Sequence, residues 1–343
     1  MSNAYSPVLW NRQKKRYDKI MAGLIALYLV TFIGLQVVFH SEITIETIII
    51  RATGSLSLLM LHVILSIGPL ARINPRFLPL LYNRRHLGVT MCTIALIHGI
   101  FNIIQFHALG NADPLVSVFS SNTHYASFAN FPFQVLGFFA LIILLLMAVT
   151  SHDFWLKNLS PYVWKSLHML VYIAYALLVL HVLLGIAQLE NEPVRIGVLG
   201  LGVLTVSGLH LLAALLEKRR EHKPSEVEKD GFVPVCEVDE IVENRAKVLL
   251  VAGENIAIFK YEGKLSAVNN ICKHQNGPLG EGKIVDGCIT CPWHGYQYSP
   301  QNGQSPPPFT EKVSTYDVKI IGSKVYINPK PYPEGTARPC AKI

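Results

Sequence analysis

The sequence predicts an all-α membrane bundle of six helices followed by a small, soluble, antiparallel β domain. The 343-residue chain is 51% hydrophobic and only 15% charged, its long uncharged runs end near residue 217, and short alternating runs follow residue 230. A typical soluble domain carries about 25% charged residues, so the first part of the chain needs an apolar solvent. The expected organisation is an N-terminal cytoplasmic segment 1–18, a membrane domain 19–217, a linker 218–230, a β domain 231–331 and a flexible tail 332–343.

Six apolar runs are long enough to cross a bilayer, which takes about 20 residues of helix. The first run follows several basic residues and has no small-residue cleavage site, so it predicts a retained helix and not a signal peptide. The runs lie at about 19–39, 52–70, 86–106, 131–150, 166–187 and 195–217.

Lysine and arginine residues flank these runs unevenly, fifteen on one side and two on the other. Membrane proteins keep such residues on the cytoplasmic side, so the count predicts that both termini are cytoplasmic. The same distribution accounts for the net charge of +7 and argues against nucleic-acid binding. The two are Arg51 and Arg195, and the fifteen are Arg12, Lys14, Lys15, Arg16, Lys19, Arg72, Arg76, Arg84, Arg85, Lys157, Lys165, Lys218, Arg219, Arg220 and Lys223.

Two connecting regions differ in character. The loop 107–130 on the outer side contains no Lys or Arg and is either a plain connector or part of a substrate or partner site. After the charged linker come short apolar runs separated by turn residues, which is typical of a small antiparallel β domain. The segments "KYEGKL" and "IIGSKV" predict hairpin turns within it.

Cysteine and histidine residues form two close pairs in the stretch "ICKHQNGPLGEGKIVDGCITCPWHGYQYS". Cys272 and His274 form a Cys-x-His pair, Cys291 and His294 form a Cys-x-x-His pair, and sixteen residues lie between the two pairs. Such side chains bind zinc or iron, so the pattern indicates a metal site. A structural Cys₂His₂ zinc site is one interpretation, although the order of ligands is unusual for it. Another is a "CITC" redox dithiol or half of a zinc ribbon, formed by Cys288 and Cys291.

The segments "PLGEG" and "CPWHG" favour a third interpretation, because with the four ligands they resemble Rieske domains over the whole β domain. The resemblance implies a [2Fe–2S] cluster in which Cys272 and Cys291 bind one iron while His274 and His294 bind the other. Cys288 is then a bystander.

Residues beside the ligands indicate the type of Rieske domain. Rieske proteins of quinol–cytochrome c complexes carry an extra disulfide where this chain has Gly277 and Trp293. Those proteins also place Ser and Tyr after the last histidine to hydrogen-bond the sulfurs, whereas this chain has Tyr296 and Tyr298. The domain is therefore similar to the ferredoxin type, which implies a low to intermediate potential within the Rieske range of about −150 to +300 mV.

Four histidines lie within the third and fifth apolar runs, where polar side chains are costly and mark functional sites. His86 and His98 are 12 residues apart in the third run, and His168 and His181 are 13 apart in the fifth. These offsets correspond to about 18–20 Å along a helix. Because both helices run in the same direction, the offsets predict two levels, His86 with His168 and His98 with His181, as two stacked haems require. A 12-residue offset turns a helix by about 120°, so His86 is the least well placed.

The membrane region resembles the ferric reductase-like transmembrane family, most closely its bacterial branch, the haem subunit of periplasmic methionine sulfoxide reductase. The resemblance implies one or two b-type haems, with His98, His168 and His181 at ligand positions. His86 occupies the variable position of the Arg-Arg-x-Leu-Gly motif, and His62 is either a reserve ligand or a packed histidine. The segments that carry the resemblance are "ILSIGPLARINP", "YNRRHLGVTMCTIALIHGI", "FQVLGFFALIILLLMAVTS" and "VWKSLHMLVYIAYALLVLHVLL".

Eukaryotic members of this family feed their haems from a cytoplasmic flavin and nicotinamide domain, and the sequence shows no flavin or nicotinamide site. Its glycine cluster "GVLGLGVLTVSG" lies in the sixth run with no preceding strand. The prediction is a ferric reductase-like oxidoreductase in which the Rieske domain replaces the flavin module. Electrons would come from a cytoplasmic ferredoxin or flavin reductase and leave to an outer-side quinone, ferric iron, oxygen or periplasmic partner enzyme.

Other functions stay open at this point. The chain could be a non-catalytic, membrane-anchored electron carrier within a larger redox complex. A membrane-bound Rieske oxygenase would need a 2-His-1-carboxylate iron domain, and none follows the cluster motif. The expected location is the bacterial inner membrane, as a multi-pass protein whose termini are both cytoplasmic.

Overall fold

The computed structural model describes residues 12–39, 42–81, 83–127, 130–152, 154–155, 159, 161–189, 193–221, 231–274, 277–292 and 295–343. The described chain forms two compact units. One is helical and contains residues 12–69 and 83–210, and the other contains the β domain. Each unit is considered by itself below.

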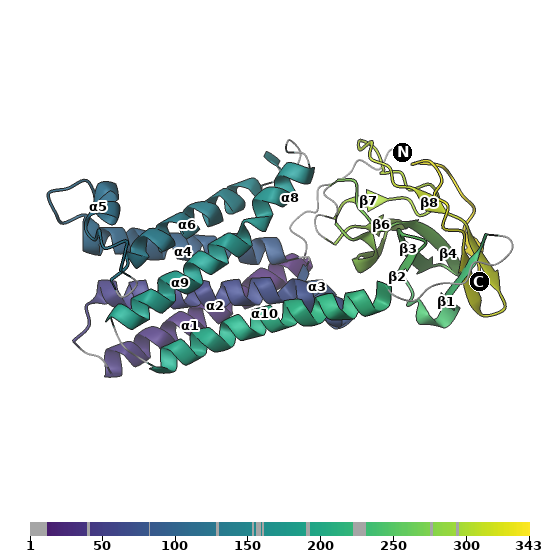
Figure 1. Ribbon diagram of the computed structural model, residues 1–343. Helices are drawn as coiled ribbons and strands as arrows, with labels where there is room; N and C mark the ends of the chain where they lie inside the picture. Colours follow the sequence, from purple (N-terminus) through teal and green to yellow (C-terminus); the bar gives the residue numbers. More distant parts are fainter. Residues whose placement is uncertain are drawn as a thin grey trace. The chain divides into compact units, whose positions relative to one another are not determined.

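Six helical spans in the chain are long and apolar enough to cross a membrane, as the sequence predicted (Figure 1). Their outward side chains are apolar and exposed, for example Val30 and Leu204, each 72% accessible. Such faces suit lipid and not water. The long helices are α1 (Arg12–Phe39), α2 (Ile45–Ile73), α4 (Arg84–His107), α6 (Phe133–Thr150), α9 (Val171–Leu189) and α10 (Pro193–Glu221). The short ones are η1 (Pro75–Phe77), α3 (Leu78–Leu81), α5 (Pro114–Ser120) and α8 (Pro161–Met169).

Several boundaries differ from those expected. Helix α1 begins at Arg12, inside the segment 1–18, and α10 continues to Glu221, inside the linker 218–230. Residues 222–230 lie outside the described part. The fifth span is interrupted at Leu170, between α8 and α9, directly after the helix that carries His168.

The loop 107–130 contains helix α5, which packs against α4 and α6. Its N-terminus is capped by Asp113, whose carboxylate accepts hydrogen bonds from the backbone N–H groups of Leu115 (2.9 Å) and Val116 (3.3 Å). Pro114 occupies the first helical position, where its missing N–H costs nothing. Part of this loop is therefore an ordered structural element.

Close packing at glycines sets the helix neighbours. Helix α6 packs along α9, where Gly185 lies against the ring of Phe133. A Cβ at Gly99 of α4 would come within 2.7 Å of Leu141 of α6. Small residues let membrane helices approach closely in this way, because packing replaces the hydrophobic effect in lipid.

The β domain consists of three small antiparallel sheets. In the largest, strands run in the order β11-β4-β3-β2, with β8 paired to β4; the others have the orders β1-β10-β9 and β5-β6-β7. The strands are β1 (Val233–Glu237), β2 (Ala246–Val251), β3 (Glu254–Tyr261), β4 (Lys264–Asn269), β5 (Lys283–Val285), β6 (Cys288–Thr290), β7 (Gln297–Tyr298), β8 (Thr315–Tyr316), β9 (Val318–Ile321), β10 (Lys324–Ile327) and β11 (Ala341–Lys342).

The predicted hairpins are present. Strands β3 and β4 pair from Tyr261↔Lys264 onward, and Glu262 and Gly263 between them both have positive φ (47° and 67°). That conformation matches the right-handed twist of the flanking strands and favours glycine at its second position. Strands β9 and β10 pair from Ile321↔Lys324 and are joined by Gly322 and Ser323, where only Gly322, at the first position of the turn, has a positive φ (62°).

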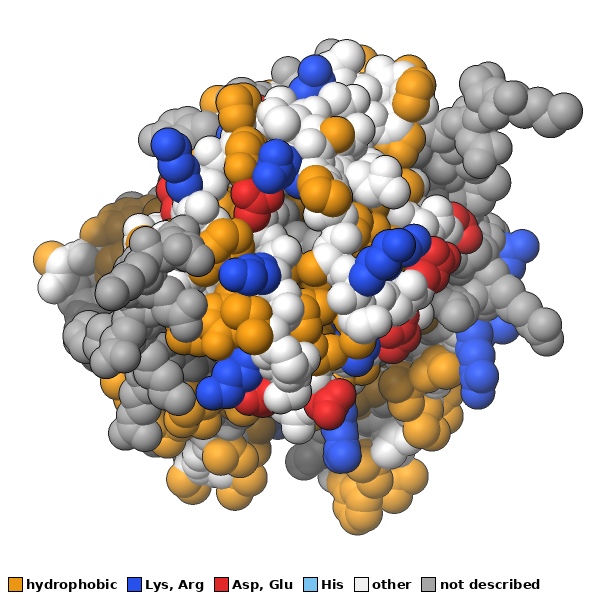
Figure 2. Space-filling model, turned by 90° about the vertical axis from the view of Figure 1, so that its right-hand side faces the viewer, with side chains coloured by type: hydrophobic (Ala, Val, Ile, Leu, Met, Phe, Trp, Pro, Cys, Tyr) orange, Lys and Arg blue, Asp and Glu red, His pale blue; other side chains and the backbone are white. Residues whose placement is uncertain are grey.

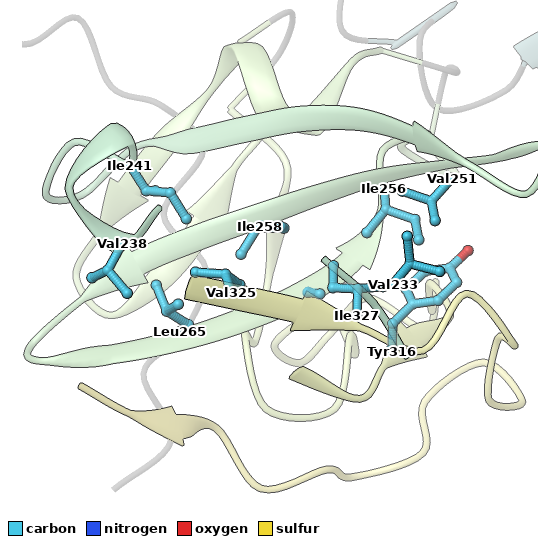
Figure 3. Packing of buried hydrophobic residues seen from close by; sticks show 11 residues of the cluster. Val233, Val238, Ile241, Val251, Ile256, Ile258, Leu265, Tyr316, Val325 and Ile327 are labelled. Carbon is cyan, nitrogen blue, oxygen red and sulfur yellow. The ribbon is translucent and has the colours of Figure 1, made fainter. Parts of the chain in front are cut away.

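One core holds the first two sheets together. Figure 3 shows side chains from β1, β3, β10 and the η2 turn (Val238–Glu240) meeting between the strands. The buried residues of this core are Val233, Val238, Ile241, Val251, Ile256, Ile258, Leu265, Ala267, Tyr316, Val325 and Ile327.

On the surface, basic and acidic side chains are interspersed with apolar ones on the face seen in Figure 2.

The expected flexible tail 332–343 is instead part of the β domain. Its strand β11 pairs with β4 through Ala341↔Leu265 and Lys342↔Lys264. Upstream, Arg338 pairs with Asp317 and its guanidinium lies 4.0 Å from the centroid of the Tyr332 ring. The expectation rested on the polar, proline-rich composition, which these long-range contacts override.

Candidate metal centres

Two loops of the β domain hold the cysteines of the predicted cluster, and both are closed in the same way. After β4, the Cys272 N–H donates to the Gly277 carbonyl at 2.9 Å. After β6, the Cys291 N–H donates to the Tyr296 carbonyl at 2.8 Å. Each bond spans five residues, and both cysteines are only 1% exposed within one apolar cluster. The two thiols are thus fixed and shielded from water.

Glycines of the "PLGEG" segment are required by contact with neighbouring strands. A Cβ at Gly280 would lie 2.2 Å from a methyl group of Val248, and one at Gly282 would lie 2.1 Å from the Thr290 carbonyl oxygen. No side chain tolerates such distances. This segment therefore packs as bare backbone against β2 and β6, which fixes the chain between the two cysteine loops.

Tyr298 places one hydroxyl group beside a cysteine sulfur. Its oxygen accepts the Lys273 N–H at 3.0 Å and lies 3.3 Å from the Cys272 Sγ, a contact in which either atom can donate while Cys272 is a thiol. Burial, reinforced by Cys272, raises the pKa of Tyr298 well above the usual value for a phenol. Tyr298 therefore keeps its proton and would donate to Cys272 if that sulfur were a metal-bound thiolate.

Tyr296 has a different role, since its hydroxyl group donates to the Glu311 carboxylate. Burial and this hydrogen bond raise the pKa of Tyr296. Its ring stacks on His274 with centroids 4.6 Å apart and planes 9° apart. Tyr296 thus supports an imidazole, while Tyr298 is the tyrosine that contacts a sulfur. Glu311 was not identified from the sequence, because it lies outside the motif.

The remaining members of the predicted set are placed as follows. His294 and Trp293 lie outside the described residues. Cys288 is half-buried on β6, where burial and Asp286 raise the pKa of its thiol, and all six cysteines of the chain are free of disulfides. Among the described residues, no three Cys, His, Asp or Glu side chains converge to hold one metal ion. A Rieske cluster requires no such group, because each of its irons takes two protein ligands.

In the helical unit, His98 of α4 and His181 of α9 face each other. Their ring centroids are 6.4 Å apart and their planes are nearly perpendicular, at 81°. Each Nδ1 is bonded to a backbone carbonyl, His98 to Ile50 at 2.9 Å and His181 to Phe133 at 2.8 Å. A carbonyl only accepts, so both Nδ1 atoms carry the proton and both Nε2 atoms keep a lone pair.

This geometry fits two imidazoles that share one metal ion. Metal–imidazole bonds of about 2 Å on opposite sides of an ion place the ring centroids about 6 Å apart. Metal-bound histidines usually donate their other N–H to a carbonyl or carboxylate, as both rings do here. The described residues offer no hydrogen bond to either Nε2, so both remain available for a ligand bond.

The second predicted pair, His86 and His168, has no ring contact among the described residues. His86 Nδ1 lies 3.0 Å from the Asp18 carboxylate of α1, a hydrogen bond not foreseen from the sequence. His168 stacks on Trp164 at 3.8 Å, with its Nδ1 bonded to the Trp164 carbonyl (3.0 Å) and its Nε2 3.2 Å from the Ser151 hydroxyl group. To bind a metal through Nε2, His168 would have to lose its contact with the Ser151 hydroxyl group.

His62 has the geometry of a packed histidine. Its Nδ1 donates to the Leu58 carbonyl at 2.8 Å, and a Cβ at Gly202 of α10 would lie 2.5 Å from its Nε2. The nitrogen that could bind a metal is therefore covered by a helix. Its ring also contacts Tyr175 edge-on at 5.5 Å.

Two family descriptions match separate parts of the chain. Residues 231–317 match the Rieske [2Fe-2S] domain, and residues 51–179 match the ferric reductase like transmembrane component. The chain therefore joins a ferric reductase-like transmembrane domain and a Rieske domain in one polypeptide. It is a multi-pass membrane protein with an electron-transfer domain. The transmembrane match ends two residues before His181, so the place of His181 rests on the geometry above.

Known relatives match the β domain. The ferredoxin component of the alkene monooxygenase system of Xanthobacter autotrophicus is 33% identical over 119 residues, which cover 34% of this chain and 98% of that protein. The anthranilate 1,2-dioxygenase ferredoxin subunit of Burkholderia cepacia is 30% identical over 28% of this chain and 89% of that protein. The ferredoxin of carbazole 1,9a-dioxygenase from Nocardioides aromaticivorans has a TM-score of 0.27 at 24% identity, covering 28% of this chain and 98% of that one.

Proposed function

We propose that the chain carries electrons across a membrane, from a cytoplasmic donor to an acceptor on the outer side, by way of a Rieske cluster and b-type haem. The observation that carries this proposal is the facing pair His98 and His181, with both Nδ1 atoms bonded to carbonyls and ring centroids 6.4 Å apart. A Rieske domain in the same chain supplies the matching entry point.

The residues have distinct tasks in this proposal. Cys272 and Cys291 hold one iron of the cluster, His274 and His294 hold the other, and Tyr298 stabilises the sulfur of Cys272 by its hydrogen bond. In the bundle His98 and His181 hold a haem iron. The cluster and the haem supply one-electron redox chemistry, which no side chain of the protein provides by itself.

The second predicted pair, His86 and His168, has less structural support in this proposal, because their rings do not contact each other among the described residues. His168 is the first ligand of a second haem and His86 its opposite ligand, with His86 oriented by Asp18. Iron and haem counting on the purified chain tests the whole assignment. Two haems and two cluster irons per chain are expected. If the chain binds one haem, and His86→Ala binds the same amount, only the haem between His98 and His181 would remain in the proposal.

The donor and the membrane follow from the same reasoning. Relatives of this chain include a ferredoxin component of an alkene monooxygenase system and a ferredoxin subunit of anthranilate 1,2-dioxygenase. A soluble flavin reductase or ferredoxin is therefore the proposed cytoplasmic donor. The bacterial inner membrane is the proposed location, with both termini cytoplasmic. The fifteen-to-two distribution of flanking Lys and Arg supports that orientation.

A second candidate function is that of an electron carrier with no substrate of its own. The names of the relatives favour it, since both are components that serve another protein. Turnover by the purified chain with quinones, ferric chelates and oxygen separates the two. Haem reduction through the cluster without turnover of any acceptor would identify a carrier that needs a partner on the outer side.

A further inference from the structure

Each of the two facing histidine rings packs against a glycine of a neighbouring helix. The His98 ring lies against Gly54 of α2, where an added Cβ would come within 2.8 Å of its Cε1 and Nδ1 atoms. The His181 ring lies against Gly137 of α6, where an added Cβ would come within 2.9 Å of the same two atoms. In both cases the ring presents its Nδ1–Cε1 edge to a glycine.

The carbonyl partners repeat the pattern. Ile50 precedes Gly54 by four residues, and Phe133 precedes Gly137 by four, so each carbonyl lies one helical turn before its glycine. Each histidine follows its carbonyl partner by 48 residues. Helices α2 and α4 therefore form one unit, and α6 and α9 form a second with the same internal spacing.

We infer that Gly54 and Gly137 are positioning residues that set the two imidazoles of one shared iron. The glycine lets the ring approach the neighbouring backbone, the carbonyl takes the Nδ1 proton, and Nε2 is left for the metal. Each ring is oriented by its own helix pair, and the two ring planes are nearly perpendicular, at 81°. This inference rests on the proposed haem between His98 and His181.

His62 shows that a glycine contact by itself is not sufficient. Its ring also lies against a glycine, Gly202, and its Nδ1 also bonds a carbonyl. There the glycine meets Nε2, and the carbonyl belongs to Leu58 of the same helix. The contact therefore blocks the nitrogen that the other two histidines keep available.

The test compares four alanine variants of the full chain purified in detergent: Gly54→Ala, Gly137→Ala, Gly202→Ala and Gly34→Ala. Gly202→Ala imposes a comparable clash on a histidine outside the pair, and Gly34→Ala meets no atom within 4 Å. The readouts are haem content and the low-spin ferric EPR signal, with the EPR signal of the Rieske cluster as a check that the chain is intact. Nearly perpendicular imidazole planes give a strongly anisotropic low-spin signal, and a rotated ring makes that signal more rhombic.

Gly54→Ala and Gly137→Ala are expected to change this signal and to retain haem about 10–100-fold less tightly, as loss of an orienting partner does at metal sites. The two control variants are expected to keep the wild-type signal. If all three clashing variants change alike, or if Gly54→Ala and Gly137→Ala behave like Gly34→Ala, the inference is wrong. Absence of haem from the wild type would instead refute the proposed function.

A measurement on the wild type keeps the inference testable if these variants do not fold. Pulsed EPR of the oxidised protein should detect a proton on the Nδ1 of both imidazoles that exchanges slowly in D₂O, because each is hydrogen-bonded to a carbonyl of a neighbouring helix. Axial imidazoles whose Nδ1 protons exchange freely, or are absent, would overturn the positioning role.

Discussion

The β-domain site and the membrane histidine pair are built in opposite ways. In the β domain each cysteine is fixed by a carbonyl five residues later in the same loop. In the bundle each histidine is fixed by a carbonyl 48 residues earlier on another helix. The first kind of site can form within one small domain, whereas the second exists only after four helices have packed. We therefore expect the two centres to be lost independently.

The largest effect is expected from the cysteine loops. Cys291→Ser removes a thiolate ligand and should abolish the EPR signal of the reduced cluster, while the haem absorption spectrum stays at its wild-type intensity. Cys288→Ser is the matched control, because this neighbouring thiol lies on β6 and is kept protonated by burial. Loss of haem together with the cluster in Cys291→Ser would show that the two sites are not independent.

Removal of either facing histidine gives the complementary effect. His98→Ala and His181→Ala should each eliminate the outer haem, which is about half of the total if the chain holds two haems, and should leave the cluster signal unchanged. His210→Ala is the control, since that ring bonds Val206 and Tyr172 and takes no part in the pair. Equal haem loss in the control would mean that the bundle and not the ligand had been disturbed.

The inner level should respond less uniformly, because its two histidines are not preset as a pair. His168→Ala is expected to remove the second haem. Asp18→Asn should weaken binding of that haem by about tenfold, through loss of the carboxylate that orients His86. The haem content and the haem midpoint potentials of the two variants measure these effects. An unchanged second haem in Asp18→Asn would show that Asp18 does not orient His86 for binding.

The smallest effect concerns the tyrosines beside the cluster. A hydrogen bond to the Cys272 sulfur favours the reduced cluster, which carries more negative charge. Because Tyr298→Phe removes this bond, it should lower the cluster potential by some tens of mV, at about 60 mV for each 1.4 kcal/mol. Tyr296→Phe should shift it less, since that hydroxyl group donates to Glu311. A redox titration followed by EPR gives both values; a larger shift for Tyr296→Phe would reverse the assignment.

The contrast also explains what could be predicted from the sequence. The cysteine loops are local, so spacing and neighbouring glycines were sufficient to predict Cys272 and Cys291 as ligands, and the structure buries both in one cluster. The six membrane spans could also be predicted from the sequence, because the length and apolarity of a segment are enough to identify it. Counting residues along two parallel helices placed His98 and His181 at one level, and their rings do face each other. Their role as haem ligands stays a prediction. Glycines behind the rings were missed, although the equal distance of 44 residues from Gly54 to His98 and from Gly137 to His181 is present in the sequence.

Other features depend on contacts that no local pattern encodes. Asp18 reaches His86 across 68 residues, and Ser151 occupies the Nε2 of His168. The last residues were expected to be loose because they are polar and rich in proline. Strand β11 and the contacts of Arg338 with Asp317 and Tyr332 order them instead. Tertiary pairing overrides composition in each case.

The central claim is that electrons reach the haem through the cluster. The most direct measurement is anaerobic reduction of the full chain in detergent by NADH and a soluble ferredoxin reductase, followed at the haem absorption bands. We predict haem reduction in the wild type and its loss in Cys291→Ser, with dithionite still reducing the haem of the variant. Haem reduction at an equal rate in Cys291→Ser would contradict the account.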